Sequence, residues 1–134
     1  MSQLKTVISG SYRKHLAELI KLKQFMQSKG VEVLAPVCGE AINPADEFVI
    51  LSDDPIEDPR LLQDSIFSKM RQASFHTLLN KDGYLGRAAT LELGYAIAIG
   101  LQILAVEPVT DPNIAPYTRL LEEVFGDTDG QGQQ

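Results

Sequence analysis

Short apolar runs alternate along this chain with longer segments in which apolar residues recur every three or four positions. The short runs predict buried strands at residues 5–9, 31–35, 75–79 and 102–106. The periodic segments predict helices at residues 11–29, 59–73, 87–100 and 116–125. The segment 48–51 is apolar as well, and it fits either another short strand or a packed loop.

Strands that alternate with helices at this spacing predict an α/β fold with a parallel sheet, because parallel strands need crossover connections. We therefore expect a three-layer, Rossmann-like or flavodoxin-like doubly wound sheet of about five strands. Residues 1–126 are expected to form one domain, and residues 127–134, rich in Gly, Gln and Asp, a flexible tail. Ligands of such sheets bind beyond the carboxyl ends of the strands, which here means residues 9–13, 36–43 and 80–86.

Composition supports one ordinary domain with a core of its own, since 44% of the 134 residues are hydrophobic. The single cysteine, Cys38, cannot form an intramolecular disulfide, and the first residues lack the apolar run of a signal peptide or a membrane span. We therefore expect a cytoplasmic protein. Cys38 could be a nucleophile, but a small thiol after a strand is more often inert packing.

The net charge of −6 is unevenly distributed. Residues 1–36 carry six basic and two acidic side chains, whereas residues 37–134 carry six basic and sixteen acidic ones. This balance argues against polymeric nucleic acid as a partner. Six acids between Asp46 and Asp58 have no basic residue among them; this pattern is typical of a solvated loop, and the spacing is not that of a calcium loop.

Glu92 is the residue that folding alone explains least. It lies among leucines, alanines and glycines in an otherwise apolar helix, and a carboxylate in apolar surroundings is costly to desolvate without partners. A purely structural explanation is that Glu92 is an acid in the N-terminal part of the helix, stabilised by the helix dipole. The alternative is a chemical role.

Two further carboxylates, Asp64 and Asp82, are expected to converge on Glu92. Clustered carboxylates suit cleavage of a glycosidic bond, where one group attacks or stabilises C1′ and another manages the proton of the leaving group. Tyr12 could hydrogen-bond the nucleophile and hold its orientation. The structural alternative makes Asp82 a turn former before Gly83, and Asp64 a surface acid.

The turn Gly10-Ser11-Tyr12-Arg13 offers free backbone N–H groups, a hydroxyl and a guanidinium at the start of a helix. These groups suit a phosphate or a polar sugar, although Gly10 could simply make the turn and Ser11 cap the helix. The chain has no dinucleotide-binding glycine motif, no Walker lysine loop and no Cys/His metal spacing, so we expect neither a cofactor nor a metal. His15, expected on an exposed helix face, and His76, within a strand, are isolated, and we do not predict histidine catalysis.

Four segments of the chain together carry a family resemblance. They are Val7-Ile8-Ser9-Gly10-Ser11-Tyr12-Arg13, Asp64, Asn80-Lys81-Asp82-Gly83-Tyr84-Leu85-Gly86, and Thr90-Leu91-Glu92-Leu93-Gly94-Tyr95-Ala96 followed by Gly100. Their order and spacing, over roughly residues 5–107, resemble the nucleoside 2-deoxyribosyltransferase-like superfamily, which includes 2′-deoxynucleoside 5′-phosphate N-hydrolases and related nucleotide N-glycosidases. The Thr90–Ala96 segment is the most specific of the four.

The resemblance implies that Glu92 is the nucleophile at C1′ and that Asp82 helps to bind or protonate the substrate. Asp64 is a further catalytic candidate, and Tyr12 would line the sugar pocket. The substrate-binding residues implied are Gly10, Ser11, Arg13, Gly83, Gly86 and Thr90. One departure is Ser74, which stands where members commonly have an aspartate just before the strand. A second departure is the ten-residue spacing between Asp82 and Glu92, which is longer than in the classical transferases.

Two functions follow as expectations. The first is cleavage or transfer at the N-glycosidic bond of a nucleoside or nucleoside 5′-monophosphate, with a slight preference for a phosphorylated substrate. The second is a non-catalytic nucleotide-binding module of the same fold, which Ser74 would favour. The base, the sugar and the acceptor are left open.

Assembly is expected because family pockets are commonly completed by a neighbouring subunit. The apolar residues of the helix 87–100 cover nearly its whole circumference, which fits burial on more than one side. We therefore expect a homodimer or a larger even assembly built partly on this helix. The alternative is that the helix is buried within the monomer.

Overall fold

The computed structural model describes residues 3–37 and 58–127. Within this part of the chain the strands are β1 (Lys5–Ser9), β2 (Glu32–Ala35), β3 (Phe75–Leu78), β4 (Ile103–Ala105) and β5 (Thr118–Leu120). The helices are α1 (Tyr12–Ser28), α2 (Pro59–Gln72), α3 (Arg87–Ala98) and α4 (Leu121–Phe125), with short 3₁₀ turns η1 (Lys81–Gly83) and η2 (Ala115–Tyr117).

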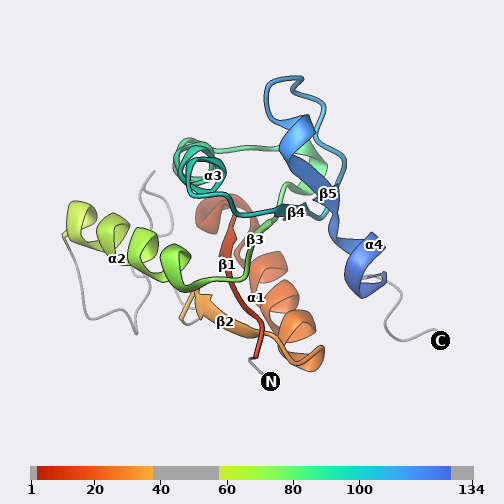
Figure 1. Ribbon diagram of the computed structural model, residues 1–134, viewed down its shortest axis with the longest axis horizontal. Coiled ribbons are helices and arrows are strands. Elements are labelled where there is room, and N and C mark those ends of the chain that lie inside the picture. The colour runs from red at the N-terminus through yellow and green to blue at the C-terminus, as the bar shows by residue number, and fades with distance from the viewer. Residues whose placement is uncertain (1–2, 38–57, 128–134) are drawn as a thin grey trace.

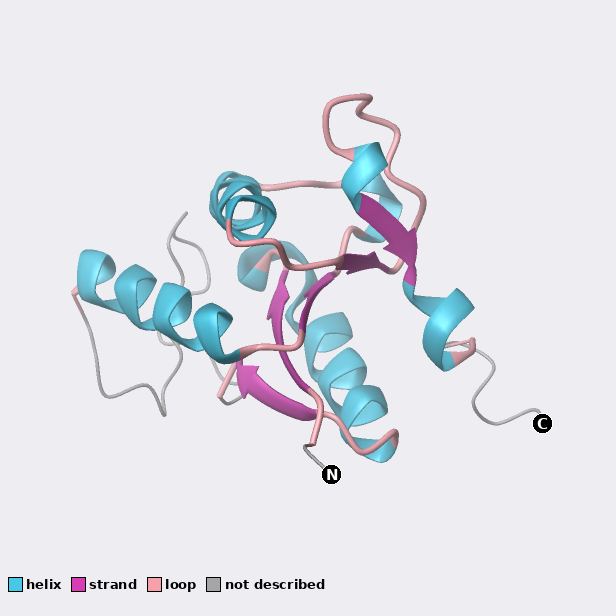
Figure 2. Cartoon of the chain, viewed as in Figure 1, coloured by secondary structure: helices cyan, strands magenta, loops and turns pink. Residues whose placement is uncertain are grey.

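All five strands are parallel and lie in the order β2-β1-β3-β4-β5. The predicted α/β fold with a parallel sheet of about five strands is thereby confirmed. Figure 1 shows α2 and α3 on one side of the sheet and α1 and α4 on the other, and Figure 2 shows the twist of the strands between them. The strand order reverses between β1 and β3, and ligands of doubly wound sheets bind at such a switch point.

Side chains of successive strand residues alternate between the two layers. On the α2/α3 side, Val7, Leu78 and Ile103 pack with residues such as Met70 and Leu93. On the α1/α4 side lie Ile8, Leu104, Leu19, Met26 and Leu121. Both sides of the sheet are therefore packed, which is the reason for its near-continuous apolar strands.

Side-chain caps fix where two of the helices begin. Ser11 Oγ accepts a hydrogen bond of 3.0 Å from the backbone N–H of Lys14 at the start of α1. Asp58 Oδ1 accepts bonds of 2.9 and 3.2 Å from the N–H groups of Arg60 and Leu61, and Pro59 takes the first helical position. Asp58, one of the acids in the 46–58 stretch, is therefore a helix cap.

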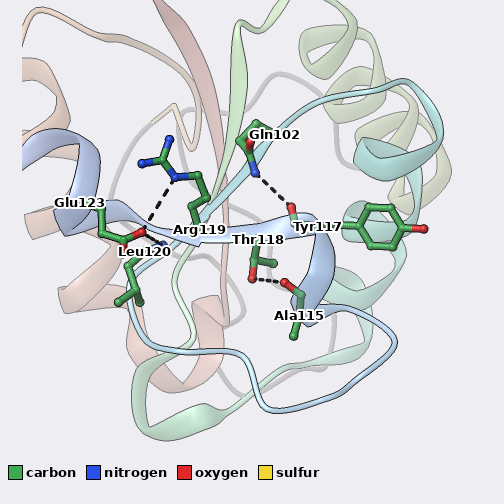
Figure 3. Close-up of polar contacts among 7 residues, drawn as sticks. All are labelled: Gln102, Ala115, Tyr117, Thr118, Arg119, Leu120 and Glu123. Carbon is green, nitrogen blue, oxygen red and sulfur yellow. Dashed lines mark hydrogen bonds and ion pairs between the residues drawn. The ribbon is translucent and has the colours of Figure 1, made fainter.

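The helix predicted over 116–125 is wrong in its first half. Thr118–Leu120 forms β5, which pairs with β4 from Ile103 to Ala105, and only Leu121–Phe125 is helical. Figure 3 shows the local bonds: Gln102 Nε2 donates to Tyr117 O, Thr118 Oγ1 donates to Ala115 O, and Glu123 accepts from the N–H of Leu120. The open edge of β4 offers backbone partners, and this pairing outweighs the apolar periodicity of the segment.

Helix α3 buries one side and exposes the other. Ala89, Leu93 and Ala96 are buried, whereas Leu91 is 54% and Ile99 39% exposed. The expected assembly on this helix stays a prediction. No helix in the described parts of the chain is long and apolar enough to cross a membrane.

Several sequence-based expectations concern residues outside the described part of the chain. They are the possible strand 48–51, Cys38 and most of the loop 36–43, the acidic residues before Asp58, and the tail beyond residue 127.

Gly10 allows β1, α1 and the end of β3 to approach closely. A Cβ atom at this position would lie 3.0 Å from Leu19 Cδ2 and 3.1 Å from Leu79 Cβ. Such distances leave no room for a methyl group unless the neighbours move. The glycine is therefore required by packing.

We expect Gly10→Ala to lower the free energy of unfolding by about 1–3 kcal/mol, because the added methyl overpacks this junction. The matched control is Gly94→Ala, at an exposed helical position with nothing within 4 Å of the added atom. It should raise the stability by about 1 kcal/mol through helix propensity. Urea unfolding followed by circular dichroism measures both, and an unchanged stability of Gly10→Ala would contradict the close approach.

Candidate active site

A pocket of about 380 Å³ lies at the switch point, beyond the carboxyl end of β1. Its wall comes from the end of β1, the first turn of α1, the inward side of the first two turns of α2 and the N-terminal half of α3. This volume is in the range of small-ligand sites. The placement agrees with the general rule for parallel sheets, and Glu92 lies in the wall.

Glu92 projects from the second turn of α3 and is half-buried, with both carboxylate oxygens hydrogen-bonded. Ser9 Oγ, at the end of β1, donates a short hydrogen bond to Oε1. Gln63 Nε2, in the second turn of α2, donates to Oε2 at 2.9 Å. Burial raises the pKa of Glu92 above the usual glutamate value, and the bonds from Ser9 and Gln63 oppose this rise. Three separate elements thus hold one carboxylate in the pocket wall.

His76 is linked to Glu92 through Ser9. Its Nε2 lies 2.7 Å from Ser9 Oγ, and both side chains are buried, with 0% and 1% exposed. Burial lowers the pKa of His76 from 6.5 to about 4, so the ring is neutral at neutral pH. The expectation that His76 is isolated is therefore wrong, because parallel pairing of β1 and β3 brings residues 67 positions apart into contact.

The first turn of α1 forms one side of the pocket, as expected. Gly10, Ser11, Tyr12 and Arg13 all line it, and Arg13 has no ion pair within the described residues. The N-terminus of α1 is directed at this region, with Ser11 as the cap. The free N–H groups and positive dipole end of a helix favour an anion here.

The start of α3 forms a second positive side. Gly86 is the N-cap residue without a side-chain cap, and Arg87, Ala88 and Ala89 follow it in the pocket wall. Two helix N-termini and two arginine residues, Arg13 and Arg87, therefore line the same pocket. Sequence reasoning missed Arg87, although its place in the first turn of a helix at a strand end was a readable signal.

Tyr84 lines the pocket and contacts residues in the first turn of α1. Lys14 Nζ lies 4.3 Å from the centroid of its ring, and the His15 ring meets it edge-on at 6.1 Å. His15 is half-buried and its Nδ1 is buried, so the expectation of an exposed His15 is wrong. Its backbone dihedrals, φ −132° and ψ 37°, depart from the helix at this point and set the ring against Tyr84.

Asp64 does not converge on Glu92. Its side chain is 58% exposed, forms an ion pair of 3.9 Å with Arg60, and does not line the pocket. The preceding residue, Gln63, takes the expected place, because successive helical residues are rotated by about 100°. Gln63 lies three positions before Ile66 and so shares the inward side of α2, a spacing that could have identified it.

Asp82, Gly83 and Thr90 also lie outside the pocket. Asp82 is exposed in η1, with φ 58°, and its backbone N–H donates to Glu107 Oε2 at 3.0 Å. Gly83, with φ 75°, serves the same turn, and neither residue lines the pocket. Thr90 is exposed, and its hydroxyl donates to Gly86 O at 2.7 Å within α3. Among the described residues, Glu92 is thus the one carboxylate in the pocket wall.

Ser74 lies at the far end of the sheet from the pocket. Its N–H donates to Lys5 O at 2.7 Å, and its Oγ accepts from the N–H of Lys5 at 3.0 Å, so it extends the pairing of β1 and β3 at their amino ends. The four residues of β3, about 13 Å, separate it from the carboxyl edge. A serine at this position therefore removes no carboxylate from the pocket.

Metal ligation has no candidate in residues 3–37 and 58–127. No group of three or more His, Cys, Asp or Glu side chains there could hold a metal ion. The polar groups of the pocket wall are instead one carboxylate, two guanidinium groups, hydroxyls and an amide.

Comparison with known proteins adds a structural neighbour. No protein-family model matches the chain, and no curated protein matches it. Among solved structures, the CMP N-glycosidase BcmB of Clostridium botulinum is similar, with 15% sequence identity and a TM-score of 0.51. The alignment covers 75% of this chain and 66% of that one, so the chain spans just under two thirds of its neighbour. At this identity the likeness shows a shared fold and nothing finer.

Proposed function

We propose that this protein cleaves the N-glycosidic bond of a nucleoside 5′-monophosphate, with Glu92 as the nucleophile at C1′. One observation carries the proposal: a half-buried carboxylate in the wall of a ligand-sized pocket, held by a hydrogen bond on each oxygen. A structural acid would have no need to face a pocket. The CMP N-glycosidase activity of the structural neighbour supports the same reaction class.

The first chemical step is displacement at C1′. A Glu92 oxygen forms a bond to C1′ while the bond from C1′ to the base nitrogen breaks, and the base leaves with that electron pair and takes a proton from water. The product is a glycosyl ester on Glu92. Because Ser9 and Gln63 each hold one oxygen, the oxygen that does not attack keeps a donor in the ester.

The second step releases the sugar. Water attacks C1′, the ester bond breaks, and Glu92 returns to its carboxylate form while one proton goes to solvent. We propose hydrolysis in preference to transfer because the structural neighbour is named as a glycosidase. The two-carboxylate scheme expected from Asp64 and Asp82 is not proposed, since both lie outside the pocket.

The 5′-phosphate is assigned to the space between the starts of α1 and α3. Two helix N-termini and the residues Arg13 and Arg87 line this part of the pocket. Helix N–H groups and guanidinium groups bind phosphate oxygens by charge-assisted hydrogen bonds. Glu92 repels an anion, so the phosphate should bind at the helix ends while C1′ approaches the carboxylate.

A non-catalytic nucleotide-binding module remains the second function to test. The sequence feature that favours a binding module is Ser74, which replaces an aspartate common in the family. Ser74 lies at the opposite edge of the sheet and leaves the pocket carboxylate in place. The hydrogen-bonded Glu92 therefore favours the enzyme over the binding module.

Glu92→Gln should lower release of free base from nucleoside 5′-monophosphates by about four orders of magnitude or more, because an amide cannot attack C1′. Its affinity for the nucleotide should be retained. Chromatography of released base and calorimetric titration of binding measure the two. The matched control is Glu122→Gln, an exposed acid on α4, which should behave as wild type. Nucleotide binding without base release by the wild type would support the binding module instead.

Arg13→Gln should raise KM for a nucleoside 5′-monophosphate by about tenfold and leave kinetics on the matching unphosphorylated nucleoside unchanged. The reason is the loss of one charge-assisted hydrogen bond to phosphate, worth about 1.5 kcal/mol or more. Steady-state kinetics on both substrates give the comparison. Equal effects on nucleotide and nucleoside would contradict the phosphate assignment and leave the Glu92 assignment untouched.

A further inference from the structure

Three polar side chains form a row that runs from the core into the pocket. His76 lies on β3, Ser9 at the end of β1 and Glu92 on α3. Ser9 Oγ is placed between His76 Nε2, at 2.7 Å, and Glu92 Oε1. Ser9 and His76 are fully buried on the α2/α3 side of the sheet. The strand neighbours of His76 there are Val7 and Ile103. An apolar pair of side chains would pack there at less cost, so the polar pair calls for a functional explanation.

The order of the three groups excludes a serine nucleophile. In a Ser-His-acid triad the histidine lies between the hydroxyl and the acid, and it removes the hydroxyl proton. Here the hydroxyl lies in the middle, and its proton is directed to the carboxylate. Ser9 is thus a donor to Glu92, and His76 cannot act as its base.

When Glu92 is ionised, as a nucleophile must be, counting protons fixes the histidine tautomer. An ionised carboxylate only accepts, so the single Ser9 proton must go to Glu92, and Nε2 of His76 must then carry the proton given to Ser9 Oγ. Nδ1 is left with a lone pair, and it is buried without a hydrogen-bond partner among the described residues. The other tautomer would bury an unpaired N–H at Nδ1. It would also draw the Ser9 proton to Nε2, leaving two oxygen lone pairs in close contact.

We propose that Ser9 and His76 are a positioning pair for Glu92: neutral His76, protonated on Nε2, donates to Ser9 and thereby locks the serine hydroxyl as a donor to Glu92 Oε1. The effect of the pair on catalysis rests on the proposed function, whereas the contacts among the three side chains do not. The pair holds the carboxylate in one orientation without adding charge. It also favours the ionised form that a nucleophile needs, against the effect of burial.

Loss of the hydrogen bond from Ser9 should change the pH dependence of activity in a definite direction. Burial raises the pKa of Glu92, and the Ser9 bond lowers it, so loss of that bond raises it further. Activity that needs ionised Glu92 is lost as pH falls through this pKa. The other titratable or charged groups around the pocket are Tyr12 and Arg13 on α1, Tyr84, and Arg87 on α3. The side chain of Gln63 on α2 is a neutral amide.

The first test is independent of activity. Long-range ¹H–¹⁵N NMR of the imidazole rings distinguishes the tautomers, and a His15→Gln variant assigns the signals, since the chain has two histidines. The expected result for His76 is the Nε2–H tautomer at pH 7, remaining neutral well below pH 6. An Nδ1–H tautomer or a charged ring at pH 7 would overturn the proposal, whether or not the protein cleaves nucleotides.

The second test measures the acidic limb of kcat with a saturating nucleoside 5′-monophosphate. Ser9→Ala should move this limb up by about one to two pH units, as expected for a lost hydrogen bond to a charged group. His76→Phe should move the acidic limb in the same direction. In His76→Gln the amide N–H can replace the Nε2–H donor, so the limb should lie close to its wild-type position. Circular dichroism spectra confirm folding of each variant. An unmoved limb in folded Ser9→Ala would overturn the pair's role, whereas an inactive wild type with the expected tautomer would overturn only the proposed function.

Discussion

The candidate site depends on keeping one carboxylate ionised and correctly oriented in a pocket that is partly apolar. Burial works against the charge of Glu92, and hydrogen bonds from Ser9 and Gln63 work for it. Each donor comes from a different element, so the carboxylate is held only when the sheet and both helices are assembled. The fold and the chemistry are linked through this one group.

The topology of the sheet supplies that arrangement. Strand order reverses between β1 and β3, so the chain leaves the sheet in opposite directions on either side of this point and opens a space beyond the strand ends. Ser9 marks the end of β1, α1 begins beside it, and α3 brings its first two turns over the opening. The close approach at Gly10 lets the β1–α1 turn lie near the end of β3.

The repeated strand and helix patterns were enough to predict the parallel sheet, and Glu92 stood out because its carboxylate interrupts an apolar helix. What the sequence could not reveal depended on contacts between distant segments. The Ser9–His76 contact follows from strand register, and β5 from the open edge of β4. Gln63 and Asp64 are adjacent in sequence, and the rotation of α2 alone decides which of them meets Glu92. A neutral amide in an apolar stripe is a weaker sequence signal of a functional site than the neighbouring acid.

The most direct test of the central claim is to trap the covalent intermediate on Glu92. A nucleoside 5′-monophosphate with fluorine at C2′ destabilises the oxocarbenium-like transition states, so a glycosyl ester should accumulate on the enzyme. We predict a protein mass increased by the fluorinated sugar phosphate, located by peptide mapping at Glu92 and absent from Glu92→Gln. Base release from this analogue without a sugar bound to the protein, or a sugar bound at another residue, would contradict the account.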